Sequence, residues 1–98
     1  MPEFPGGTQA LFQYLARNVH YPEIARINGV EGRVFVQFVV NKSGEITNVS
    51  ILRGVNASLD REALRVVSAM PLWEPGRQNN QPVSVSFTVP INFVLENR

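Results

Sequence analysis

The chain has 98 residues, which is enough for one domain and too few for two. Hydrophobic residues make up 44% of it, so it can build a core and does not have the composition of a disordered chain. The 9 lysines and arginines balance 8 acidic residues and form no basic run, which argues against nucleic-acid binding. Cysteine is absent, so disulfides and thiolate chemistry are excluded. No apolar run reaches membrane-spanning length and no signal peptide opens the chain, so a domain that works outside the cytoplasm would need a targeting part not contained in this sequence.

The first third of the chain predicts an arm and two helices. Residues 1–7, "MPEFPGG", are rich in turn-forming residues and predict an extended arm. Thr8 is a candidate N-cap for a helix that ends near Val19. Its apolar face is predicted from helical spacing to contain Leu11, Phe12, Leu15 and Val19. Pro22 suits the start of a second, short helix, which Asn28 and Gly29 end.

Two strands and a tight turn follow. From Gly32 onward the hydrophobic period becomes two, and one strand face is predicted to contain Val34, Val36, Phe38 and Val40. Phe35 and Val39 make the other face partly apolar as well, which favours a central position in the sheet. "NKSG" predicts a hairpin turn in which Gly44 takes a positive φ. The return strand spans about 45–53. Ile46 is out of step with the alternation of Val49 and Ile51, which predicts a bulge near Thr47.

A third helix and a proline-rich connection come next. Ser58 is the candidate N-cap, and the buried stripe is predicted to contain Leu59, Ala63, Val66, Val67 and Met70. The polar side chains expected to face water are Asp60, Glu62 and Arg65. In "MPLWEPGRQNNQPVSV", Pro71 ends the helix, and Pro75 with Gly76 fits a type II turn. Residues 77–81 are expected to form a polar loop, and the single tryptophan, Trp73, is interpreted as a structural anchor for the following strand.

The last strand has a regular alternation from Val83 to Leu95, with Glu96 continuing its polar face. Pro90 has no N–H, which places the strand at a sheet edge. Because alternate residues aim their backbone groups at opposite neighbours, Pro90 and the even-numbered residues face the free side while the odd-numbered ones pair with the strand at 33–40. The predicted fold is therefore α+β, with a three-stranded antiparallel sheet of order 2-1-3, helices packed on one face and the last strand at the edge.

An open edge has two interpretations. It is an ordinary edge blunted by one proline, or it accepts an extended peptide or a second copy of the chain by β-augmentation. The candidate partner-binding residues on this edge are Ser84, Val85, Ser86, Phe87, Thr88, Val89, Pro90, Ile91 and Asn92.

Catalytic and metal sites have little support. His20 is the sole histidine, and no serine has a G-x-S-x-G context. One histidine without cysteine argues against a zinc site, and no cofactor motif is present. Trp73 beside Arg77 allows a cation–π contact, but a core tryptophan is the favoured interpretation. We therefore expect a binding module and not an enzyme.

The ordered motifs resemble the C-terminal domain of TonB energy-transducing proteins. The first half of the resemblance is carried by Tyr21-Pro22, Gly32-Arg33-Val34, Gly44-Glu45-Ile46 and Asn48-Val49-Ser50-Ile51. The second half is carried by Leu59, Asp60, Ala63, Val67, Trp73, Pro75, Gly76, Val83, Val85, Pro90, Ile91 and Phe93. "FPGG" is similar to the version of the domain found in Bacteroidetes-type bacteria. The resemblance covers nearly the whole chain, as a single domain over 1–98.

The resemblance implies a periplasmic domain of an inner-membrane-anchored protein. Such a domain docks the TonB box of an outer-membrane transporter on its last strand. It thereby couples proton-motive force, delivered through ExbB/ExbD-like partners, to the uptake of nutrients such as siderophores. The best-studied members carry Gln-Pro before Tyr-Pro, whereas this chain has "NVHYP", so only Tyr21 and Pro22 transfer as possible additional contacts. Alternatives are a self-associating domain that forms strand-exchanged dimers, or a TonB-like domain of a signalling or peptidase fusion.

Overall fold

A three-stranded antiparallel sheet forms the centre of the molecule in a computed structural model that describes residues 1–95. The strands are β1 (Gly32–Val40), β2 (Ile46–Arg53) and β5 (Val85–Phe93), in the order β2-β1-β5. The predicted α+β class and the predicted sheet order are confirmed. Glu96, which was expected to extend the last strand, lies outside the described residues.

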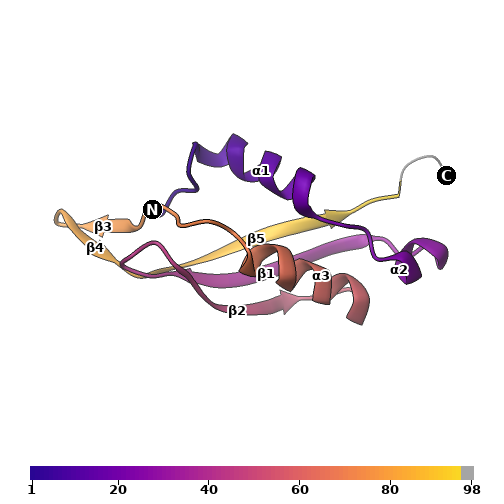
Figure 1. Ribbon diagram of the computed structural model, residues 1–98. Coiled ribbons are helices and arrows are strands. Elements are labelled where there is room, and N and C mark those ends of the chain that lie inside the picture. The colour runs from indigo at the N-terminus through magenta and orange to yellow at the C-terminus, as the bar shows by residue number, and fades with distance from the viewer. Residues whose placement is uncertain (96–98) are drawn as a thin grey trace.

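Helices cover one face of this sheet. Helix α1 (Gly7–Asn18) lies beside β5, and α3 (Ala57–Ser68) lies against β1 and β2 on the same side, as Figure 1 shows. The short α2 (Glu23–Ile27) follows Pro22, which is its N-cap. The buried core joins both long helices to the sheet and contains Leu11, Leu15, Val34, Val36, Phe38, Val40, Leu59, Ala63, Val66, Val67, Val89, Ile91 and Phe93.

Strand β1 is the central strand, because it pairs with β2 along one edge and with β5 along the other. Its sequence is apolar on one face and mixed on the other. Its even-numbered residues from Val34 to Val40 are fully buried, whereas Phe35 and Val39 on the opposite face are half-buried. A strand with partners on both sides satisfies its backbone groups on both edges. The predicted central position of β1 is therefore confirmed.

The β1–β2 turn has the predicted geometry. Gly44 has a φ of +87°, and Asn41 holds the turn through its side-chain oxygen, which accepts from the N–H of Ser43 and of Glu45, each at 2.9 Å. The register then slips between the pairs Val39–Thr47 and Gln37–Ser50, where Asn48 has a φ of +52°. This is the bulge that the position of Ile46 predicted.

Both predicted N-caps are wrong. Helix α1 begins at Gly7 after Gly6, so Thr8 lies inside the helix and caps nothing. Helix α3 is capped by Asn56, whose side-chain oxygen accepts from the N–H of Leu59 at 3.0 Å. Asparagine is as good a cap as serine, and the helix starts two residues earlier than the Ser58 assignment requires.

Phe12 is also misassigned, because its side chain is 52% exposed and does not belong to the core. Tyr14 takes the inward position instead: it packs against Phe4 at 5.6 Å between ring centroids and donates from its hydroxyl to the carbonyl of Val66 at 2.9 Å. Helix α1 covers the sheet close to its edge, so its buried face is narrower than helical spacing suggests.

The connection after α3 contains a second hairpin that the sequence did not predict. Strands β3 (Gly76–Gln78) and β4 (Gln81–Val83) pair antiparallel around Asn79 and Asn80, which have φ of +53° and +65°. The expected polar loop at 77–81 is therefore wrong. Gly76 lies in a strand and is not among the positive-φ glycines, so the expected type II turn at Pro75-Gly76 is wrong as well.

The N-terminal arm packs against this region. Glu3 forms a β-bridge with Glu74, with backbone hydrogen bonds of 2.9 and 2.7 Å. Phe4 is 7% exposed and meets the Trp73 ring edge-on at 5.7 Å. Figure 1 places the N-terminus beside β3, at the end of the molecule where the hairpin projects.

Candidate interaction edge

Strand β5 is an edge strand, with β1 as its only paired neighbour among residues 1–95. The ladder runs without a register shift from the pair Gly32–Phe93 to the pair Val40–Val85. It passes through Pro90, which lies opposite Phe35. A proline is tolerated inside a continuous ladder only where its nitrogen faces away from the neighbour. Pro90 and the other even-numbered residues therefore direct their backbone groups to the free side.

The candidate edge residues from Val85 to Asn92 all lie in β5, whereas Ser84 lies between β4 and β5. The predicted strand start at Val83 is wrong, because Val83 pairs with Gly76 in the second hairpin. Within β5, Ser86, Thr88 and Asn92 are exposed and Pro90 is half-buried.

Two side chains of this edge are tied to β1 on the face of the sheet away from the helices. The Gln37 amide donates to the Ser86 hydroxyl at 3.3 Å, and the Arg33 guanidinium donates to the Asn92 side-chain oxygen at 2.7 Å. These contacts occupy side chains and leave the outward backbone groups unaffected. The edge therefore offers N–H and C=O groups at Ser86, Thr88 and Asn92, and only C=O at Pro90, the pattern that an added strand can pair with.

The start of β5 is held by an aromatic cluster around Trp73. The indole meets Phe87 at 5.2 Å and Phe38 at 5.4 Å between ring centroids, and it is 4% exposed. So little of the ring is accessible that it offers no platform for a ligand. The neighbouring Gly76 packs against Val85, where a Cβ would contact the valine side chain.

Tyr21 and Pro22 lie at the other end of β5. The Tyr21 ring contacts Phe93 edge-on at 5.6 Å, and its hydroxyl donates to the carbonyl of Val30. Pro22 starts α2. Tyr21 therefore fixes the loop before β1, and it also lines a groove that includes Pro90.

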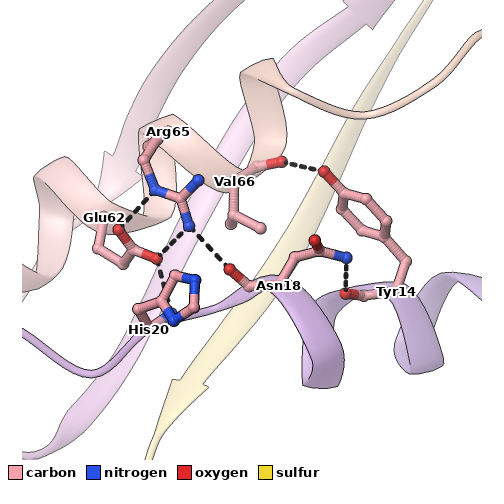
Figure 2. Close-up of polar contacts among 6 residues, drawn as sticks. All are labelled: Tyr14, Asn18, His20, Glu62, Arg65 and Val66. Atoms are coloured by element: carbon pink, nitrogen blue, oxygen red, sulfur yellow. Dashed lines mark hydrogen bonds and ion pairs between the residues drawn. The ribbon is translucent and has the colours of Figure 1, made fainter.

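A polar cluster joins the end of α1 to α3, as Figure 2 shows. Glu62 accepts from the backbone N–H of His20 at 2.7 Å and from Arg65 at 2.6 Å, and Arg65 donates to the carbonyl of Asn18 at 2.7 Å. The Glu62 side chain is only 12% exposed, so the expectation that it simply faces water is wrong. The Arg65 hydrogen bonds lower the pKa of Glu62; burial opposes this and the His20 N–H reinforces it.

The pKa values of two other members of this cluster, Arg65 and Tyr14, are shifted as well. The Glu62 carboxylate raises the pKa of Arg65, and burial raises the pKa of Tyr14. Arg65 places a cation at the C-terminus of α1, where the helix dipole favours positive charge. The cluster is a structural link between the two helices.

A metal-binding cluster and a membrane-spanning helix are both absent from the described residues 1–95. No group of three His, Asp or Glu side chains in residues 1–95 is arranged to hold a metal ion. None of the helices between residues 1 and 95 has both the length and the apolar character needed to cross a membrane.

The fold and the edge define a small α+β domain whose last strand is open on one side. Residues 17–95 match the family model described as Gram-negative bacterial TonB protein C-terminal, and the chain belongs to this family. The Bacteroidetes-type assignment stays a prediction. The family consists of non-enzymatic transduction proteins, in agreement with the expectation of a non-enzyme.

Curated relatives carry the same family name. The chain is 35% identical over 81 residues to Protein TonB of Pseudomonas aeruginosa, covering 80% of this chain and 23% of that protein. It is 31% identical over 90 residues to Protein TonB of Pseudomonas putida, covering 88% and 36% respectively. The chain thus spans about a quarter to a third of the length of these relatives.

Solved structures have the same fold. The solution structure of a Helicobacter pylori TonB C-terminal domain superposes with a TM-score of 0.67 at 23% identity, covering 92% of this chain and 95% of that one. The Pseudomonas aeruginosa TonB C-terminal domain gives a TM-score of 0.63 at 29% identity, covering 81% and 80%.

Proposed function

We propose that this domain docks the TonB box of an outer-membrane transporter as an additional strand on β5. The observation that supports the proposal is the one-sided pairing of β5, with exposed polar residues along its outer edge. In strand addition, main-chain hydrogen bonds supply affinity and side-chain pockets supply selectivity. Family membership supports the choice of partner.

The domain would act as the periplasmic end of an inner-membrane-anchored parent protein. Contacts with an ExbB/ExbD-like complex are assigned to other parts of that parent, and no nucleic acid or cofactor is involved. Force or movement from the inner membrane reaches the transporter through the β5 ladder. Uptake of nutrients such as siderophores is the expected outcome.

The test is a titration of the labelled domain with a synthetic TonB-box peptide, followed by amide chemical shifts. We expect the largest shifts at Ser86, Thr88 and Asn92, with weaker pairing near Pro90. Shifts that cluster on β2 or α3 and spare β5 would contradict the proposal.

A backbone-directed variant sharpens this test. Thr88→Pro removes one outward N–H while leaving the inward ladder intact, because residue 88 faces the same side as Pro90. We expect it to weaken peptide binding by a few-fold to about tenfold, because one backbone hydrogen bond contributes about 0.5–1.5 kcal/mol net. Thr88→Ala keeps the N–H and serves as the control, with affinity close to that of the wild type. Equal affinities for the two variants would show that the peptide does not pair at this position.

The same unpaired edge supports self-association as a second candidate function. Two copies could pair or exchange their β5 strands to form a dimer. Sedimentation over a wide concentration range separates the two candidates. If the protein stays monomeric even at millimolar concentration, self-association is excluded as its function.

A further inference from the structure

A groove runs along the helix side of β5, next to the proposed docking edge. One wall is formed by Phe12 and Ala16 of α1 and by Val19, which follows the helix. The other wall is the end of β5 from Pro90 to Phe93, together with Val94, which follows the strand. Its volume is about 330 Å³. Figure 1 shows α1 extending over this part of β5. The groove and the edge therefore share the same stretch of strand.

The groove is lined mainly by apolar residues, with Tyr21 and Asn92 as the polar ones, and it exposes large side chains to solvent. Phe12 is 52% exposed and Val94 is 59% exposed, although both are large hydrophobic residues. None of the described residues that line the groove carries a charge. A charged partner group would lose its hydration there without gaining an ion pair, whereas an apolar group would gain from burial.

The geometry of strand addition directs partner side chains to this place. Successive side chains of a strand point to opposite faces of the sheet. Every second side chain of a strand added to β5 therefore falls on the helix side, where α1 is the nearest wall. Pro90 offers no N–H at this position, so the backbone ladder is weakest where the groove lies.

We propose that the groove between α1 and Pro90–Val94 receives a bulky apolar side chain of the docked peptide. The inference rests on the proposed function, since the groove acts only if a strand is added on β5. Recognition then has two parts. Backbone pairing along β5 holds any extended peptide, and the groove selects peptides with a leucine-like or aromatic residue at one register position.

The test combines protein variants with a scanned peptide. One TonB-box peptide is made with leucine, alanine or aspartate at each position in turn, and its affinity is measured by calorimetry for wild type and Phe12→Ala. At one position we expect leucine to bind about tenfold better than alanine to the wild type, from the area of one buried side chain. Phe12→Ala should reduce this preference several-fold, which a double-mutant cycle detects.

Two more variants keep the result interpretable. Ala16→Leu fills the groove from an exposed helical position and should lower the affinity of the leucine peptide while the helix is retained. Leu72→Ala removes an apolar side chain that is 61% exposed outside the groove, and it should leave binding unchanged.

The outcomes separate this inference from the proposed function. If Phe12→Ala and Leu72→Ala bind alike while Thr88→Pro still weakens binding, the groove assignment is wrong and edge docking stands. If no β5 amide responds to any peptide, both fail. If Phe12→Ala reduces self-association in sedimentation and leaves peptide affinity unchanged, the occupant is a second copy and the peptide assignment is overturned.

Discussion

The backbone N–H of Trp73 donates to the carbonyl oxygen of Gly44 at 2.8 Å, joining the connection after α3 to the turn between β1 and β2. Gly44 is buried, and a Cβ at this position would overlap the carbonyl oxygen of Trp73. The absence of a side chain at residue 44 therefore lets the tryptophan backbone approach. This contact sets where the aromatic cluster sits, and so where β5 begins.

Gly44→Ala should destabilise the domain more than an ordinary glycine substitution. It adds a backbone clash to the strain of a φ of +87°, and we expect a loss of about 3 kcal/mol in the free energy of unfolding. Gly29→Ala is the matched control, because Gly29 has a φ of +66° but open space around it. That variant should lose about 1 kcal/mol from strain alone. Equal losses in urea denaturation would show that the contact with Trp73 has no energetic role.

The sheet could be predicted from the sequence because its signals are local and strong. Clean alternation from Val34 to Val40 indicated a buried strand face, and one proline, Pro90, was enough to place β5 at the edge. The polar link from Glu62 to His20 could not be predicted, because it joins residues 42 apart in sequence whose approach depends on how the helices pack. The groove at Phe12 was missed for a related reason: helical spacing places Phe12 near the core side, but α1 covers the sheet only close to its edge.

Trp73 offers a direct test of the aromatic cluster. Trp73→Ala should cost about 3–5 kcal/mol, as expected for removing a large buried ring. Trp73→Phe should cost much less, because it keeps an aromatic ring and removes a buried indole N–H that has no hydrogen-bond partner within the described residues. Urea denaturation followed by circular dichroism measures both. Loss of peptide binding by Trp73→Ala at unchanged stability would mean that the ring contacts a ligand instead.

The hairpin between β3 and β4 makes a prediction about its two asparagines. A two-residue loop with positive φ at both positions is a type I′ turn, for which Asn-Gly is the preferred pair. Asn80→Gly should therefore be neutral or slightly stabilising, whereas Asn80→Val should cost about 1–2 kcal/mol because a β-branched residue is strained at positive φ. Thermal unfolding measures both. A loss for Asn80→Gly as large as that for Asn80→Val would contradict this turn. Consecutive asparagines were the local signal that could have predicted it, since asparagine tolerates positive φ better than most residues.

The link between α1 and α3 should make stability depend on pH at the acidic end. The Arg65 hydrogen bonds lower the pKa of Glu62 below the value of about 4.3 for an unfolded glutamate, so the folded state binds this proton less readily than the unfolded state. The stabilisation is therefore fully present above about pH 4.3, and it is lost as the pH falls through the folded-state pKa.

Glu62→Gln should remove this part of the dependence and lower stability at neutral pH by about 1–2 kcal/mol, because the amide is a weaker partner for Arg65 and for the N–H of His20. Glu23→Gln is the control, since Glu23 pairs with Arg26 at a site where its side chain is 74% exposed. Urea denaturation between pH 3 and pH 7 compares the variants, and a wild-type profile that matches Glu62→Gln across this range would exclude the carboxylate of Glu62 as the source.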